Sequence, residues 1–170
     1  MVSSNDEREK VVFLSLGSNL GDRQRNLSLS RELIQDKIGK IDLKSGIYKT
    51  EAWGSEKLNW FYNQVIGVVT TLDANQVLQY CLEIETSLGR ERIDSATYEN
   101  RAIDIDVLLF GKQVVNTSNL KVPHPRLHLR NFVLFPLAEI APEIMHPIFG
   151  LSIKILKNNC ADPNKIQSIE

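Results

Sequence analysis

At the start of the chain, apolar and polar positions predict a strand followed by a helix. Residues Val11–Leu16 form an apolar run that ends in the turn-forming sequence GSNLGD, so this run predicts a strand and a tight turn. From Leu27 to Ile38, apolar residues recur at helical spacing and predict a helix over about residues 22–38. A strand, a turn and a helix therefore open the predicted fold.

The middle of the chain continues with strands and a second helix. Residues Tyr62–Leu72 are rich in Val, Ile and Thr, which predicts a strand. Asp73 can then cap a helix whose apolar residues recur at helical spacing as far as Leu88. Before Tyr62, the pattern predicts a strand over Lys44–Thr50 and a loop over Glu51–Phe61 that contains both tryptophans. After Leu88, it predicts a long exposed polar loop over 90–101 and a strand over Ala102–Phe110.

The order strand, helix, strand, strand, helix, strand is that of a split βαβ unit. We therefore expect a ferredoxin-like α+β fold, in which an antiparallel sheet is flanked by helices on one face and carries long active-site loops. Next we expect a short strand over Gln113–Asn116, paired with the strand before it, and a short helix through Phe135–Ile140. We expect a polar tail over residues 1–10 and one domain over 11–170, with no assigned structure after residue 150.

Composition narrows the functional classes. Of 170 residues, 42% are hydrophobic and 24% charged, which is typical of a folded globular protein and excludes a disordered or fibrous chain. The formal net charge of −1 provides no overall field for nucleic acid or an anionic membrane. Cys81 and Cys160 lack CxxC spacing, and the N-terminus resembles no signal peptide. We expect a cytoplasmic monomer with reduced thiols that acts on small molecules.

The clearest chemical feature is the sequence RAIDIDVLLF in the fourth long strand. Because successive strand residues point to opposite faces, Asp104 and Asp106 share one face while Ile103, Ile105 and Val107 share the other. Two like charges so close are unfavourable without a cation, and Mg²⁺ prefers oxygen ligands. The pair therefore indicates a metal site, although solvated carboxylates on an exposed strand are an alternative.

Basic residues surround this pair in the sequence. Arg90, Arg92 and Arg101 precede it, and further basic or imidazole side chains follow at Lys121, His124, Arg126, His128 and Arg130. Guanidinium groups bind phosphate in a bidentate manner, so the cluster favours phosphoryl-type transfer from a nucleotide. A GxxxxGK[ST] loop and the protein-kinase motifs are missing from the sequence. The sequence LGSNLGD is more typical of a structural turn than of a phosphate-binding loop.

Six motifs together resemble one enzyme family. LGSNLGDR, SGIYKTEAWG, FYNQV, LGRER, RAIDIDVLLFG and VPHPRLHLRNFVLFPLAEIAPE occur in this order between about Val11 and Ile148. Their order and spacing are similar to those of the 6-hydroxymethyl-7,8-dihydropterin pyrophosphokinases of folate biosynthesis. The resemblance implies a ferredoxin-like fold that uses ATP and two Mg²⁺ ions to transfer pyrophosphate to the pterin hydroxymethyl group, releasing AMP.

The resemblance also implies roles for individual charged residues. Asp104 and Asp106 would bind the two Mg²⁺ ions, and with Arg90 and Arg92 they would form the catalytic set. The nucleotide and its phosphates would contact Glu85, Arg90, Arg92, Arg101, His124 and Arg130. No residue is an obligatory strong base; Asp106 is a candidate to accept the hydroxyl proton.

For the pterin, the family pattern implicates Thr50 through its backbone, together with Trp53, Phe61, Asn63, Tyr98 and Phe132. A flat bicyclic ring fits this set, because Phe132 and Tyr98 can stack on its two faces and the Asn63 amide can bind its edge. Core packing remains an alternative for Trp53, Phe61 and Phe132.

The chain departs from the family pattern at the nucleotide side. The polar loop has Thr97-Tyr98-Glu99-Asn100-Arg101 where the family usually carries an extra basic residue and an aromatic-Gly-Pro-Arg run, and it is one residue longer. Further on, Asn119 stands where an arginine is common and Pro125 where a tyrosine is common. These departures predict altered contacts to ATP. From the residues alone, a nucleotide-sensing module and a metal-dependent phosphohydrolase remain alternatives to the transferase.

Overall fold

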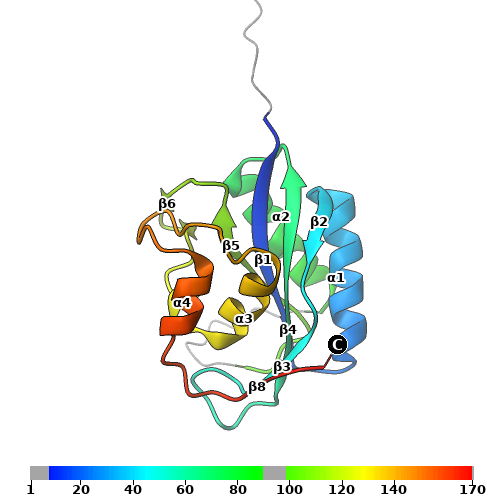
Figure 1. Ribbon diagram of the computed structural model, residues 1–170. Coiled ribbons are helices and arrows are strands. Elements are labelled where there is room, and N and C mark those ends of the chain that lie inside the picture. Colours follow the sequence, from blue (N-terminus) through cyan, green and yellow to red (C-terminus); the bar gives the residue numbers. More distant parts are fainter. Residues whose placement is uncertain (1–7, 90–98, 170) are drawn as a thin grey trace, which may run out of the picture.

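The computed structural model describes residues 8–89 and 99–169 (Figure 1). Asp22 caps α1 and Asp73 caps α2 through a capping box with Gln76, so both predicted helix starts are confirmed. The elements are, in chain order, β1 Lys10–Ser18, α1 Arg23–Lys37, β2 Lys40–Lys44, β3 Tyr48–Thr50, β4 Phe61–Thr70, α2 Ala74–Ser87, β5 Asp104–Phe110, β6 Val115–Asn116, β7 Lys121–Val122, the 3₁₀ turn η1 Leu127–Leu129, α3 Asn131–Ile140, α4 Ile153–Asn159 and β8 Ile166–Ser168.

The main sheet has 6 strands and the strand order expected for a split βαβ unit. β1 lies between β5 and β4 and is antiparallel to both. On its other side, β4 pairs with β2 and with β3, and β8 extends the sheet beyond β3. The antiparallel α+β fold predicted from the sequence is thus confirmed.

The strand predicted over Lys44–Thr50 is confirmed only over β3, Tyr48–Thr50; β2, Lys40–Lys44, is a separate strand that was not predicted and ends where the predicted strand begins. Ser45 interrupts the ladder between them. Its hydroxyl accepts a hydrogen bond from the backbone N–H of Val65 (3.0 Å), and the Gln64 side chain donates to the Ser45 carbonyl (2.6 Å). Ser45 keeps one backbone hydrogen bond to β4, from its N–H to the Val65 carbonyl (3.0 Å), while its hydroxyl and the Gln64 side chain make the other hydrogen bonds at this position.

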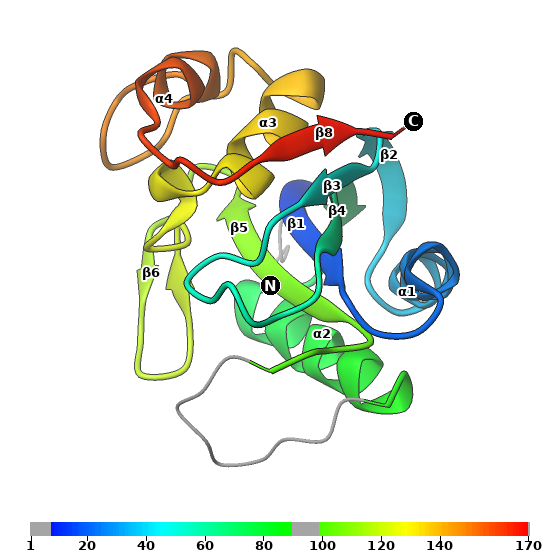
Figure 2. The ribbon, with the colours of Figure 1, turned by 90° about the horizontal axis from the view of Figure 1, so that it is seen from below.

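Helices cover both faces of the sheet, which corrects the expectation of helices on one face (Figures 1 and 2). On the face of α1 and α2, Leu14 and Ile66 belong to one buried cluster. On the opposite face, Phe13, Val65 and Leu108 pack with residues of α3 and α4 in a second cluster. The α3 sequence NFVLFPLAEI is almost entirely apolar and contains Pro136, so it has no polar stripe to mark a helix that covers a sheet.

Two smaller predictions also change. The short strand predicted over Gln113–Asn116 does not pair with β5; it is β6, and it pairs with β7 in a separate two-stranded sheet. The helix predicted over Phe135–Ile140 begins earlier, at Asn131. That earlier start brings residues 130–132 to the end of the sheet where the candidate site lies.

Candidate active site

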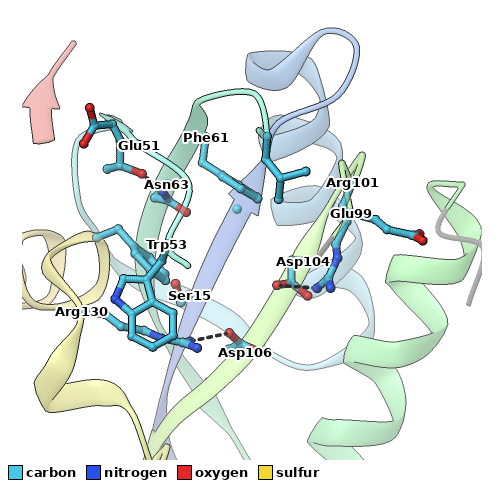
Figure 3. A pocket seen from close by; sticks show the side chains of 14 residues that line it. Ser15, Glu51, Trp53, Phe61, Asn63, Glu99, Arg101, Asp104, Asp106 and Arg130 are labelled. Atoms are coloured by element: carbon cyan, nitrogen blue, oxygen red, sulfur yellow. Dashed lines mark hydrogen bonds and ion pairs between the residues drawn. The ribbon is translucent and has the colours of Figure 1, made fainter. Parts of the chain in front are cut away.

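Neighbouring strands bring the candidate residues side by side on the face of the sheet that α3 covers. In the sheet register, Gly17 of β1 lies opposite Asn63 of β4 on one side and Asp104 of β5 on the other. Ser15 of β1 similarly lies opposite Asp106. Because side chains alternate along a strand, these positions project to the same face and line one pocket (Figure 3). The expected shared face of the two aspartates is confirmed.

The two aspartates differ in their surroundings. Arg101 approaches Asp104 with a nitrogen-to-oxygen distance of 3.2 Å. Burial, and then the charge of Asp104, raises the pKa of Asp106 from 3.8 to about 7. Two carboxylates held together in this way attract cations and raise the free energy of the ionised pair when no cation is bound.

Asp106 also faces residues that follow β7. Arg130 lies 3.9 Å and His124 lies 4.0 Å from its Oδ2. Burial and the charges of Arg130 and Arg126 lower the pKa of His124 to about 4, so its imidazole is neutral at pH 7. The Arg126 backbone N–H donates to His124 Nδ1 (3.1 Å), which leaves the proton on Nε2, facing Asp106. His124 therefore offers a hydrogen-bond donor there and no positive charge.

A first pocket opens between β3, β4 and the start of α3. It is lined by Thr50, Glu51, Trp53, Leu58, Phe61, Asn63 and Phe132, together with Ser15, Gly17, Glu99, Arg101, Asp104, Asp106 and Arg130. The Asn63 amide donates to the Thr50 hydroxyl at 2.6 Å, and both side chains are buried. The predicted pterin-side residues Thr50, Trp53, Phe61, Asn63 and Phe132 thus lie in one pocket.

Arginine side chains contact the aromatic wall of this first pocket. The Arg130 guanidinium lies 4.7 Å from the Trp53 ring centre and 5.4 Å from that of Phe132, and Arg126 lies 5.5 Å from Trp53. Such contacts hold a guanidinium in a fixed plane. Trp53 and Phe132 therefore orient the Arg130 guanidinium at the edge of the pocket, which distinguishes them from residues that only pack in the core.

A second pocket adjoins the first across β5. It is lined by Glu85, His124 and Arg126 and by the two positions at which the chain departs from the family pattern, Asn119 and Pro125. The two pockets share Arg101, Asp104, Asp106 and Arg130. Glu85 is 1% exposed and accepts a hydrogen bond from the backbone N–H of Ile105 at 2.7 Å, so it also holds the strand between the two aspartates.

Several predicted residues lie outside the described residues. Arg90, Arg92, Thr97 and Tyr98 fall in residues 90–98, so the phosphate contacts of the two arginines and the stacking of Tyr98 stay predictions. The other predicted site residues, from Thr50 to Phe132, lie around the two pockets.

Gly17 is a site position that the sequence analysis assigned only to a structural turn. A Cβ atom added at Gly17 would lie 2.8 Å from Asn63 Oδ1 and 3.5 Å from the Phe61 ring. Only glycine therefore leaves room for the Asn63 amide beside β1. A glycine directly after an apolar strand was the available signal, but it is common in turns and did not point to a site.

We expect Gly17→Ala to raise by about tenfold, equivalent to about 1.4 kcal/mol, the KM of the substrate that binds beside Asn63, because the added methyl displaces the Asn63 amide. Steady-state kinetics and thermal unfolding measure this. The control is Gly111→Ala: Gly111 has a φ of 53° and no atom within 4 Å of an added Cβ. That variant should lose about 1 kcal/mol of stability with an unchanged KM. Equal KM values in both variants would contradict the role of Gly17.

Neither a membrane-spanning helix nor a group of three metal ligands occurs among the described residues. Among residues 8–89 and 99–169, no helix is long and apolar enough to cross a membrane. In the same ranges, no group of three or more His, Cys, Asp or Glu side chains is placed to hold a metal ion by itself.

Two adjoining pockets that share a carboxylate pair and arginines are the arrangement expected of an enzyme that transfers a phosphate-containing group from one substrate to another. A sequence model of the 7,8-dihydro-6-hydroxymethylpterin-pyrophosphokinase family matches residues 13–142. The chain therefore belongs to this family of ATP-dependent diphosphokinases, which act in folate biosynthesis. This confirms the enzyme class and function expected from the six motifs.

Individual relatives agree with this assignment. The 2-amino-4-hydroxy-6-hydroxymethyldihydropteridine pyrophosphokinase of Porphyromonas gingivalis is 40% identical over 139 residues, covering 81% of this chain and 94% of the relative. That of Aquifex aeolicus is 37% identical over 147 residues, covering 86% and 90%. A fused Plasmodium falciparum HPPK-DHPS structure superposes with a TM-score of 0.70 at 19% identity, covering 91% of this chain and 45% of that chain. The fusion shares the fold, and this chain spans less than half of it.

Proposed function

We propose that the pterin binds in the first pocket, that ATP binds in the second, and that pyrophosphate passes between them at Asp104 and Asp106. The observation that carries this proposal is the set of charged residues common to both pockets: Arg101, Asp104, Asp106 and Arg130. A group transferred from a substrate in one pocket to a substrate in the other must pass the residues that line both pockets. Charged residues placed there can act on both reacting ends at once.

The carboxylate pair fits Mg²⁺. Asp104 and Asp106 come from one strand face and border both pockets, and the charge of one raises the pKa of the other. Mg²⁺ is usually held by one or two carboxylates together with substrate phosphates and water. Two Mg²⁺ ions at this pair would neutralise phosphate charge and activate the attacking oxygen. This metal count is part of the proposal.

The chain's own residues position the reaction. Asn63 uses its amide N–H to bind Thr50, so Oδ1 can accept a hydrogen bond from the edge of the pterin ring. Arg101 and Arg130 lie beside the two aspartates and can bind the phosphates as the hydroxymethyl oxygen attacks the β-phosphorus. The bond between the β-phosphorus and the oxygen that bridges it to the α-phosphorus breaks, and AMP leaves from the second pocket with that oxygen. The proton of the hydroxymethyl group passes to Asp106, the candidate acceptor beside the transferred group.

We expect ³¹P NMR of a reaction with Mg²⁺, ATP and 6-hydroxymethyl-7,8-dihydropterin to show AMP and a pterin diphosphate rising together, with no matching orthophosphate. Attack at the β-phosphorus requires this pair of products. A reaction without pterin is the control, because a phosphohydrolase would consume ATP there and a ligand sensor would consume none in either mixture. Accumulation of ADP with a pterin monophosphate would contradict the proposal.

The wider cellular expectations belong to the same proposal: a monomer that works in the cytoplasm, with one catalytic domain over residues 11–170 and no nucleic-acid or membrane partner. Both cysteines are free, in agreement with a reduced chain. Size-exclusion chromatography with light scattering measures the oligomeric state directly.

A further inference from the structure

After α4 the chain passes the start of α3 and then runs beside β3 (Figure 2), and residues at the start of α3 and in β3 line the first pocket. We name residues 160–169 the C-terminal segment; it contains β8 and follows α4. The family match ends at residue 142, so this segment lies outside the part of the chain that defines the family. The motifs that identify the family therefore do not explain the position of this segment beside the pocket.

One end of the C-terminal segment is hydrogen-bonded to β3 and to the residue after it. β8 pairs antiparallel with β3, with Ile166 opposite Thr50. Glu51 is held twice by Lys165: its backbone N–H donates to the Lys165 carbonyl (3.2 Å), and its carboxylate accepts from the Lys165 N–H (2.9 Å). The Glu51 carboxylate consequently points away from the pocket (Figure 3).

The other end of the segment binds the start of α3. The side chain of Arg130, which precedes α3, makes no capping hydrogen bond to the helix. Asp162 supplies the cap instead: its Oδ2 accepts from the backbone N–H of Asn131 at 2.9 Å, and its carbonyl accepts from the Asn131 amide at 2.7 Å. Asp162 Oδ1 also accepts from the Asn164 N–H (3.0 Å), which fixes the turn around Pro163.

The two ends of α3 are thus tied to β3 by different routes. At the C-terminal end the tie is direct, because Glu139 accepts from the Tyr48 hydroxyl (2.6 Å) and from the Gly46 N–H (2.9 Å). At the N-terminal end, the Arg130 guanidinium contacts the Trp53 ring directly, and a chain of backbone and side-chain hydrogen bonds runs through Asp162 and β8. The C-terminal segment therefore links the β3 wall of the pocket to the α3 wall.

We propose that the C-terminal segment is part of the pterin-binding apparatus, with Asp162 as a positioning residue that sets the separation between the Thr50–Trp53 wall and the Arg130–Phe132 wall. This inference rests on the proposed placement of the pterin in the first pocket. A flat ring bound between two walls gains stacking contact only at one wall spacing. If the walls already have that spacing in the free protein, less conformational entropy is lost when the ring binds.

Asp162→Ala tests the proposal in the full-length protein. Loss of the cap should raise the pterin KM and the Kd for 6-hydroxymethylpterin, measured by fluorescence titration, by about tenfold, which is about 1.4 kcal/mol. Of the wall residues Thr50, Trp53, Arg130 and Phe132, only Arg130 also lines the second pocket, so the ATP KM should rise by less than the pterin KM. The matched control is Ser152→Ala, which removes the equivalent cap of α4, where Ser152 Oγ accepts from the Ile155 N–H (3.3 Å). It should lower the unfolding temperature without changing pterin binding.

A second variant approaches the same link from the other wall. Glu51→Ala removes the carboxylate that holds Lys165, so it should raise the pterin Kd in the same direction, and this test stands even where Asp162→Ala does not fold. Because both variants break one link, the double variant should bind pterin about as weakly as either single variant.

The outcomes separate this inference from the function on which it rests. An unchanged pterin Kd in both variants, or an equal rise in the pterin and ATP constants, overturns the positioning role. Failure of the unmodified protein to bind 6-hydroxymethylpterin would instead overturn the proposed pterin pocket, before any variant is compared.

Discussion

Replacing either aspartate of β5 with asparagine, as Asp104→Asn or Asp106→Asn, is expected to lower kcat by about 10²–10³-fold or more while the protein stays folded. Each substitution removes a negative charge from the place where the two pockets meet, with little change in side-chain volume. Steady-state kinetics at saturating Mg²⁺, ATP and pterin measure the loss. Asp42→Asn is the matched control, since Asp42 is an exposed carboxyl paired with Lys40 on β2.

The same substitution at Asp106 has an opposite expected effect on stability. The folded-state pKa of Asp106 is about 7, raised by burial and by Asp104, while the unfolded chain ionises this group near its usual pKa of 3.8. Ionisation therefore destabilises the folded state increasingly as pH rises between these two values. Without Mg²⁺, Asp106→Asn should unfold at a higher temperature than the unmodified protein at pH 8, and at about the same temperature near pH 4.

Together the two measurements distinguish a metal-binding carboxylate from a structural one. A structural aspartate would lose stability at pH 8 when its charge is removed. Full activity of both variants at saturating Mg²⁺ would contradict the assignment of Asp104 and Asp106 as ligands.

Arg130→Ala is expected to lower kcat/KM by about 100- to 1,000-fold. The Arg130 guanidinium lies beside Asp106 and lines both pockets, so its charge is available to the phosphates throughout the transfer. Arg130→Lys keeps the charge but loses the planar group that stacks on Trp53 and Phe132. It should therefore recover only part of the activity. Kinetics with ATP and pterin varied separately measure both variants.

An alternative role for Arg130 is purely structural, as a spacer between aromatic side chains. In that case Arg130→Met, which keeps much of the apolar stem, would retain activity. Retention of activity by Arg130→Met, with a loss only of stability in Arg130→Ala, would contradict the catalytic role.

The fold was predictable where local signals and packing agree. Asp22 and Asp73 each stand at the start of a segment whose apolar residues recur at helical spacing, and both cap helices in the structure. The break between β2 and β3 was not predictable, because it depends on Ser45 meeting Gln64 and Val65 from another strand. The second helical layer was missed for a related reason: α3 is apolar on nearly all sides, so its sequence does not show which face packs on the sheet.

The charged part of the candidate site was more readily predicted than its shape. Strand alternation alone places Asp104 and Asp106 on one face, and the structure confirms this. The neutral state of His124 was not predictable, because it results from burial and from the nearby charges of Arg130 and Arg126. The steric requirement at Gly17 depends on the register of β1 and β4, which a single sequence does not contain.

The position of β1 in the middle of the sheet has a geometric consequence. Asn63 and Asp104 flank Gly17 on opposite sides, so they are two strand spacings apart, about 10 Å at about 4.8 Å per spacing. Backbone hydrogen bonds set this distance, and side-chain volume does not. The sheet thereby fixes the distance between Asn63, which is proposed to bind the pterin ring, and Asp104, which is proposed to bind Mg²⁺ beside the phosphates. Amino-acid changes in the pockets can therefore change the affinity for either substrate without changing the distance between Asn63 and Asp104.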